Sequence, residues 1–129
     1  QINIAVRFWR SVSSNIPDWQ QVLDKKVSSG EIRREYIHSH AVTLAGIGSA
    51  GANLLSVHLE NWEGYLKVLK TIDWSRSNHD WEGRVMFGGR LSKSRTCVSF
   101  MTAYLKKAME LPLTAEEERL EKVYSLAVR

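Results

Sequence analysis

Residues 30–58 read GEIRREYIHSHAVTLAGIGSAGANLLSVH, and this stretch decides the fold that we predict for the chain. Ile32, Tyr36, His40, Leu44 and Ile47 follow one another at steps of three and four residues. This is the spacing of side chains on one face of an α-helix. The sequence therefore predicts one long central helix over residues 30–58, with shorter helices packed around it.

Three glycines, Gly46, Gly48 and Gly51, stand inside this helical pattern. Glycine lowers the stability of a helix interior by up to about 1 kcal/mol relative to alanine, so the pattern allows a kink or a break there. Their order matches the Gly-x-Gly-x-x-Gly fingerprint of dinucleotide-binding proteins, but that motif follows a strand and the preceding residues have helical character. We interpret the small residues as a place where a second helix comes close, with the helix that carries Trp62 as the candidate.

Similar spacing predicts shorter helices in the rest of the chain. Ser28 with Glu31, and Thr114 with Glu117, have the spacing of capping boxes, which mark helix starts. Around Gly88 and Gly89 a hairpin is conceivable, but its arms would be about three residues long and marginal in water, so we expect a loop. The first of these helices is expected to end near residue 14. The others are expected to span residues 17–25, 60–71, 92–110 and 114–127. The last of them is expected to bury Leu120, Val123, Tyr124 and Ala127.

The predicted fold class is all-α: a bundle of five to six helices with a long central helix and an irregular basic loop. The chain has 129 residues, 43 % of them apolar, which is enough for a single helical domain over residues 1–129. The single cysteine, Cys97, excludes an internal disulfide, and no apolar run reaches the roughly 20 residues that cross a membrane. We therefore expect a cytoplasmic protein.

The basic loop has the sequence IDWSRSNHDWEGRVMFGGRLSKSRT (residues 72–96). No acidic residue occurs between Glu82 and Glu110, so this region is far more positive than the net charge of +4 suggests. The Gly88-Gly89 pair leaves backbone amides uncovered just before a helix start, and helix starts attract anions. This pattern predicts a phosphate-binding surface; the alternative is a solvated basic turn with capping serines. The candidate residues are Arg76, Arg84, Gly88, Gly89, Arg90, Ser92, Lys93, Ser94 and Arg95, with Arg33, Arg34 and His38 extending the surface.

Histidines and tryptophans allow more than one interpretation. His38 and His40 point to opposite sides of the predicted helix, so they cannot share a zinc ion, and neither a metal nor a cofactor is expected. We expect His40 in the core and His38 on the polar face with the arginines. Trp74 and Trp81 are expected to fill the core, although they could also stack against a ligand.

Three stretches, EIRREYIHSHAVTLAGIG (residues 31–48), the basic loop and LPLTAEEERLE (residues 111–121), resemble in this order the C-terminal part of DndB-type DNA sulfur-modification proteins. The resemblance extends over residues 8–121. It implies a DNA-binding regulator of a DNA phosphorothioation gene cluster. The Asp-Gly-Gln-His-Arg motif that names this DGQHR-motif family belongs to an upstream region and does not occur here. The resemblance therefore implies a C-terminal fragment whose partners are duplex DNA, the upstream domain of the same protein and other DNA-modification proteins.

Two other functions stay open at the sequence level. In one, the chain is a protein-interaction module that docks onto the upstream domain or another modification protein through its tryptophans. In the other, it is a Mg²⁺-dependent nuclease that uses acidic residues of the basic loop, namely Asp73, Asp80 and Glu82 with His79 and Arg84. Because Glu82-Gly83-Arg84 stands where such nucleases carry Glu-x-Lys, we expect a protein that is not an enzyme.

Overall fold

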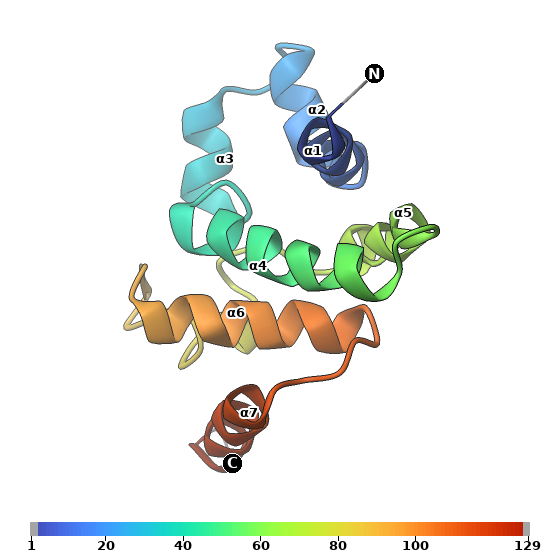
Figure 1. The fold of residues 1–129 in the computed structure, drawn as a ribbon. Coiled ribbons are helices and arrows are strands. Elements are labelled where there is room, and N and C mark those ends of the chain that lie inside the picture. The colour runs from blue at the N-terminus through green and yellow to red at the C-terminus, as the bar shows by residue number, and fades with distance from the viewer. Residues whose placement is uncertain (1–2, 128–129) are drawn as a thin grey trace.

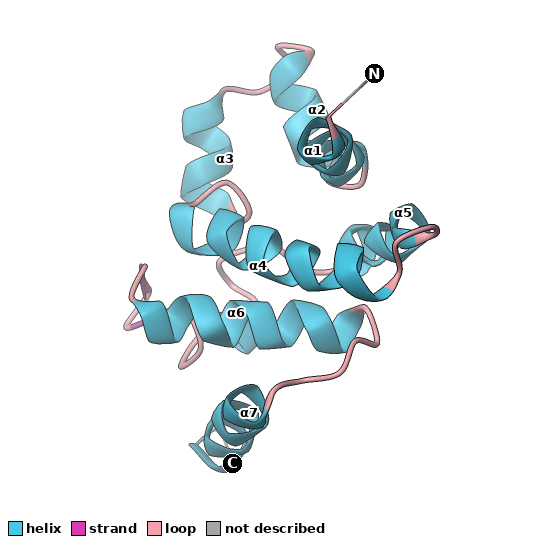
Figure 2. Ribbon diagram, viewed as in Figure 1, coloured by secondary structure: helices cyan, strands magenta, loops and turns pink. Residues whose placement is uncertain are grey.

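The computed structural model describes residues 3–127, and these residues form mainly helices (Figure 2). This confirms the predicted all-α fold class. Two short 3₁₀-helices, η1 (Leu66–Thr71) and η2 (His79–Trp81), and a hairpin of β1 (Met86–Phe87) and β2 (Arg90–Leu91) accompany the α-helices. The α-helices are α1 (Ile4–Ser14), α2 (Pro17–Leu23), α3 (Ser29–Glu35), α4 (Ala41–Val57), α5 (Trp62–Tyr65), α6 (Arg95–Ala108) and α7 (Ala115–Ala127).

Helix α4 lies in the middle of the fold, between α1 and α6 (Figure 1). Helices α4 and α6 run side by side and begin at the same end of the molecule, and α7 lies on the far side of α6 (Figure 1). A Cβ atom on Gly46 would lie only 2.3 Å from Cγ of Met101 in α6, and one on Gly51 only 2.2 Å from Cζ of Phe8 in α1. The glycines therefore let α4 pack closely on two sides. The expectation of close helix packing is confirmed, but the partners are α1 and α6 rather than the helix that carries Trp62.

The prediction of one long helix over residues 30–58 is wrong. The chain leaves the helix after Glu35 and re-enters it at Ala41, so the break lies at residues 36–40 and not at the glycines. The amide of Ile37 donates to the carbonyl oxygen of Trp74 at 2.9 Å, and the amide of Arg76 donates to that of Glu35 at the same distance. Pairing with residues 74–76 thus replaces about one and a half turns of helix. We call residues 36–40 the linker.

His38 in the linker is fully buried, not on a polar face as predicted. The Nε1 of Trp19 donates to its Nδ1 at 3.1 Å, which makes Nε2 the protonated nitrogen that donates to Asp18 at 3.0 Å. Burial lowers the pKa of His38, so the ring is neutral at pH 7. His40, expected in the core, is instead the half-buried N-cap residue of α4. Both predicted positions are wrong because helix α3 ends at Glu35, before either histidine.

Trp74 and Trp81 fill the core, as expected. Their rings stack with centroids 5.8 Å apart, and each indole N–H donates to a backbone carbonyl oxygen. The predicted helix over residues 60–71 forms as the single-turn α5 followed by η1.

The hairpin replaces the predicted loop around Gly88 and Gly89. Both glycines have positive φ angles, 61° and 79°, as a two-residue type I′ turn requires. Helix α6 begins at Arg95, where the Ser94 hydroxyl caps it by accepting from the amide of Cys97 at 3.2 Å. Strand β2 and residues 92–94 therefore separate the glycine turn from the start of α6, whereas the serine cap lies where the pattern indicates.

The C-terminal helix α7 begins with the predicted capping box. The Glu117 amide donates to the Thr114 hydroxyl at 3.1 Å, and the Thr114 amide donates to the Glu117 carboxylate at 2.9 Å. The expected buried side is wrong, because no residue within Ala115–Ala127 is buried and Val123 is 54 % exposed. Helix α7 thus rests on the outside of the fold.

Candidate nucleic-acid interface

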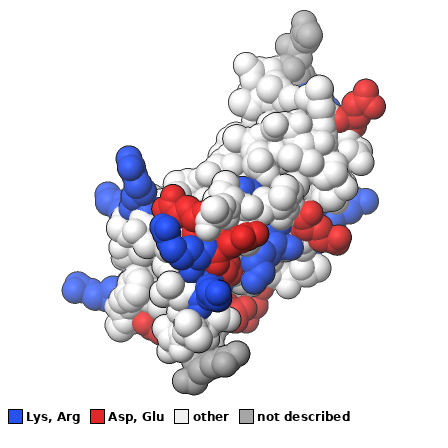
Figure 3. Space-filling view, turned by 60° about the horizontal axis from the view of Figure 1, so that its bottom comes forward, with Lys and Arg blue, Asp and Glu red and all other residues white. Residues whose placement is uncertain are grey.

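Five exposed cationic residues lie on the segments that meet where α4 and α6 begin (Figure 1). In the space-filling view, Lys and Arg side chains project from one edge of the molecule, while positive and negative groups alternate in the middle of that face (Figure 3). We call the five exposed cationic residues where α4 and α6 begin the basic edge. They are Arg33 and Arg34 in the last turn of α3, Arg90 on β2, Lys93 between β2 and α6, and Arg95 at the start of α6.

A cleft of about 270 Å³ joins α3 to the segment before α6. Arg33 stands on one side of it and Lys93 on the other, although 60 positions separate them in the sequence. The cleft is also lined by the first turn of α4 and by a hydroxyl residue, Ser92. Its residues are Arg33, His40, Ala41, Val42, Leu91, Ser92 and Lys93.

The start of α4 adds a partial positive charge to this cleft. Helix α4 is 17 residues long, and among the described residues its N-cap, His40, makes no capping hydrogen bond with its side chain. The amides at a helix start point outward and carry the positive end of the helix dipole. An anion in the cleft would therefore meet backbone amides as well as the side chains of Arg33 and Lys93.

Arg76 and His40 hold the end of α3 at the cleft. Nε and Nη2 of Arg76 donate to the carbonyl oxygen of Arg33 at 3.3 and 3.0 Å, and Nε2 of His40 lies 2.8 Å from the same oxygen. Burial lowers the pKa of His40, and the nearby charges of Arg33 and Arg76 lower it further. The guanidinium of Arg76 is thus engaged with the backbone, and His40 is a neutral ring at pH 7.

The glycine amides predicted to bind phosphate hold a carboxylate of the chain itself. The amides of Gly88 and Gly89 donate to the two carboxylate oxygens of Glu82 at 2.9 and 3.3 Å. The turn does form a small anion site, but Glu82 fills it. Ser94 is likewise used to cap α6, and Ser92 accepts a hydrogen bond from the Ser94 amide at 3.4 Å. In this conformation the prediction that the amides of Gly88 and Gly89 face a phosphate is therefore wrong. The Ser94 hydroxyl accepts from Cys97 but keeps its own O–H donor, so its phosphate contact stays a prediction.

Arg84 is also withdrawn from the surface. The residue is 4 % exposed, and its guanidinium donates to the carboxylate of Glu121 in α7 at 2.5 and 3.0 Å. The same group lies over the ring of Tyr124, 4.3 Å from its centroid. Arg84 and the buried His38 cannot reach a ligand on the surface of this conformation, and both predictions are corrected here.

The predicted site does not include the start of α4, because the predicted helix over residues 30–58 runs through residues 36–40. Their polar His-Ser-His run, directly before the apolar run of α4, was the local signal of a helix boundary. The structure brings Arg33, Ser92 and Lys93 of the predicted set together at this boundary.

A family model described as "DndB: DNA-sulfur modification-associated" matches residues 1–112. The chain belongs to the DndB family. This confirms the resemblance that residues 31–48 and 72–96 carry, and it links the chain to DNA sulfur modification. The third stretch, residues 111–121, lies almost wholly beyond the matched residues, as does α7. No curated protein and no solved structure matches the chain.

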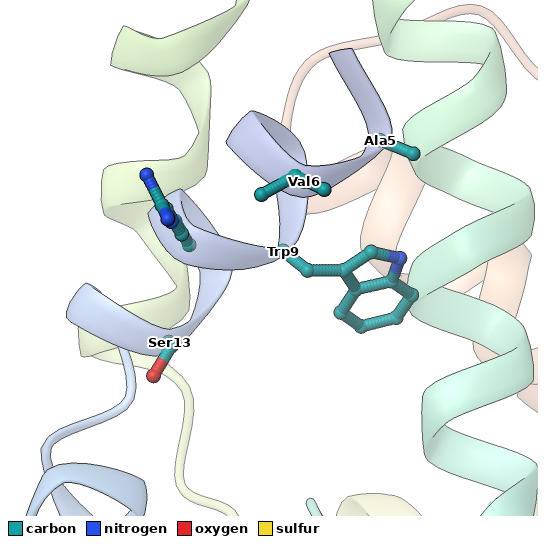
Figure 4. A pocket seen from close by; sticks show the side chains of 5 residues that line it. Ala5, Val6, Trp9 and Ser13 are labelled. Carbon is teal, nitrogen blue, oxygen red and sulfur yellow. The ribbon is translucent and has the colours of Figure 1, made fainter. Parts of the chain in front are cut away.

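A second surface of this DndB-family chain is apolar. A hollow of about 430 Å³ lies beside α1, where the indole of Trp9 points toward α4 (Figure 4). Ser13 lines both this hollow and a neighbouring one of about 380 Å³, which includes Trp19, Leu23 and Leu44. Leu23 is 67 % exposed. The α1 side of α4 therefore offers an apolar surface, in contrast to the basic edge.

Within residues 3–127, none of the helices combines the length and the apolar character that a membrane span needs. In the same residues, no three His, Cys, Asp or Glu side chains come together as a metal site would require.

Proposed function

We propose that the chain is a cytoplasmic DNA-binding domain that serves a regulatory role in a DNA sulfur-modification system. The basic edge contacts the phosphate backbone of duplex DNA, with one phosphate in the cleft between Arg33 and Lys93. The observation that carries the proposal is this cleft, because it combines two cations from distant parts of the sequence with the start of α4. Membership of the DndB family supports DNA as the polyanion.

The proposed contacts position the protein on DNA without reading its sequence. Arginine, lysine and helix-start amides make contacts of this kind to phosphate oxygens. Each phosphate neutralised by a cation contributes about 0.9 to the slope of log affinity against log salt, or roughly fivefold in affinity at 0.15 M salt. If all five cations of the basic edge make contact, the slope is about −4.5.

The acidic residues of the nuclease alternative have other partners in the structure, which supports a role that is not enzymatic. Asp73 accepts hydrogen bonds from Ser75, and Asp80 accepts one from the hydroxyl of Tyr104 at 3.3 Å. Glu82 holds the turn of the hairpin. These three carboxylates each stabilise a local turn or contact, so we propose structural roles for them.

Charge reversal tests the proposal. We expect the double variant Arg90→Glu/Lys93→Glu to bind duplex DNA about 30-fold more weakly at 0.15 M salt, because two phosphate contacts are lost. Fluorescence anisotropy with a labelled duplex at two salt concentrations measures this effect. The matched control is Lys67→Glu/Lys70→Glu, which makes the same charge change on the exposed side of η1, away from the basic edge. Equal losses in the two double variants would contradict the proposed surface.

A second candidate function is docking of a protein partner, favoured by the exposed apolar surface beside α1. Trp9 is 38 % exposed there, whereas Trp74 and Trp81, the anchors considered from sequence, are buried. On this alternative, Leu23→Glu would abolish capture of the upstream domain in a pull-down and leave DNA affinity unchanged. Loss of DNA binding in Leu23→Glu would argue against two separate surfaces.

A further inference from the structure

Helix α7 is held to the fold by charged groups and by Tyr124, whose ring packs on Phe100 and whose hydroxyl donates to the carbonyl oxygen of Asp80 at 2.9 Å. None of its residues is buried, and Val123 and Leu126 are 54 % and 66 % exposed. Its ionic attachments are two carboxylates. Glu117 accepts a hydrogen bond from Nζ of Lys106 at 2.7 Å, and Glu121 accepts the two bonds from Arg84.

Two of the three cations that contact α7 are deeply buried while it is docked, and the third, Lys107, is exposed. Arg84 and Lys106 are each 4 % exposed, and Lys107 adds a weaker contact to Glu121 at 3.3 Å. Burial alone would raise the pKa of Glu117, but the hydrogen bonds from Lys106 and Thr114 outweigh it and lower the pKa. A buried cation without an anionic partner is strongly unfavourable. When α7 leaves, these three cations need either water or another anion.

Helix α7 supplies two of the carboxylates that lie against α6 and its neighbours, Glu117 and Glu121, while Asp80 contacts Tyr104 of α6 and Glu82 lies on the hairpin turn. Residues 83–109, which include all of α6, contain no acidic residue, so α6 and the hairpin before it are purely cationic in formal charge. In Figure 3 the middle of this face alternates between positive and negative groups, next to the projecting cations at its edge. Without the carboxylates of Glu117 and Glu121, the positive charge of the basic edge would continue along α6.

A phosphodiester suits the places that these carboxylates occupy. Arginine binds carboxylate and phosphate oxygens alike with paired N–H groups, and lysine binds both as a compact charge. The family match ends at residue 112, three residues before α7 begins at Ala115. All three cations that α7 covers therefore lie within the family-matched residues, whereas α7 itself lies beyond them.

We propose that α7 is a displaceable acidic cover, and that DNA phosphates replace Glu117 and Glu121 on Arg84, Lys106 and Lys107 when α7 leaves. This inference rests on the proposed function, since it names a second contact surface for the same duplex. With α7 docked, only the basic edge contacts DNA. With α7 released, the contact extends along α6, so the position of α7 regulates affinity.

Two double variants of the full chain test the cover. Glu117→Gln/Glu121→Gln removes the two carboxylates that hold α7, and Glu116→Gln/Glu118→Gln removes two exposed carboxylates from the same helix as a matched control. Both change the net charge by two. We expect the first variant to gain about tenfold or more in duplex affinity at 0.15 M salt, and the control to gain less than about threefold. Equal gains would overturn the inference.

Hydrogen exchange on the unaltered chain gives an independent readout, which matters if the first variant folds poorly. Saturating duplex DNA should remove the protection of the α7 amides while α4 and α6 stay protected. Retained protection of α7 in bound protein would overturn the cover. If Arg90→Glu/Lys93→Glu weakens binding as expected but Glu117→Gln/Glu121→Gln brings no gain, the cover fails and the proposed function stands. If no variant binds duplex DNA, both fail together.

Discussion

Replacing Gly46 with alanine tests the packing that places the starts of α4 and α6 beside each other. The added Cβ would lie 2.3 Å from Cγ and 2.8 Å from Cβ of Met101, whereas non-bonded carbon atoms normally stay about 3.5–4.0 Å apart. The blocking atoms are next to the backbone of α6, so rotation of the Met101 side chain cannot remove the clash with its Cβ. The two helices must separate by several tenths of an ångström or more.

The expected change in the free energy of unfolding of Gly46→Ala follows from two opposing effects. Overpacking a core with one methyl group costs about 1–3 kcal/mol, and alanine gains about 1 kcal/mol over glycine in a helix interior. Because both blocking atoms are rigidly placed, we expect the upper part of the packing cost and a net destabilisation of about 1–2 kcal/mol. Gly48→Ala is the matched control in the same helix. Its Cβ would lie 3.7 Å from Cζ2 of Trp9, an ordinary contact, so this variant should gain up to about 1 kcal/mol.

Urea unfolding followed by tryptophan fluorescence measures both variants against the unaltered chain. The two alanine variants should differ by about 2–3 kcal/mol in the free energy of unfolding, with opposite signs relative to the parent. Equal stability of Gly46→Ala and Gly48→Ala would show that α4 and α6 are not in close contact at Gly46, and would refute the packing argument.

Three further predictions concern electrostatics. Folding lowers the pKa of His38 below its ordinary value of 6.5, so the unfolded chain binds protons more readily. The contribution of His38 to folding stability should therefore be fully present above about pH 6.5 and fall as the pH drops below it. His38→Asn should flatten this dependence in urea midpoints measured at pH 5 and pH 7.5. Glu82→Gln should speed hydrogen exchange of the Gly88 and Gly89 amides, as measured by NMR. It should change the free energy of unfolding by less than about 1 kcal/mol, because the carboxylate is exposed. Unchanged exchange would mean that the carboxylate does not hold the turn. Lys93→Ala should reduce the salt slope of duplex binding by about 0.9, and an unchanged slope would remove Lys93 from the contact surface.

The basic loop shows why a cationic sequence need not be a cationic surface. The sequence places Arg84, Gly88 and Gly89 in a window without acidic residues, which favours an open anion site. In the fold, Glu82, at the start of that window, and Glu121, well beyond its end, bind these groups. Glu82 lies only six residues from Gly88, but its contact depends on the tight hairpin turn, which sequence reasoning treated as a loop.

The sequence by itself determined the features that depend on neighbours three or four residues apart. These include the helical periodicity, the caps at Ser28, Ser94 and Thr114, and the helix stop before Pro17. Each rests on hydrogen bonds or side-chain spacing within about one turn, so the local order of residues is sufficient to specify it.

The tertiary structure alone decided where the central helix breaks and which cations stay free. Residues 36–40 leave the helix because their backbone pairs with residues 74–76, and Arg84 is neutralised by a carboxylate 37 positions away. The cleft between Arg33 and Lys93 likewise exists only once α3 and the segment before α6 meet at the start of α4. Such pairings depend on the whole path of the chain, and no local spacing in the sequence encodes them.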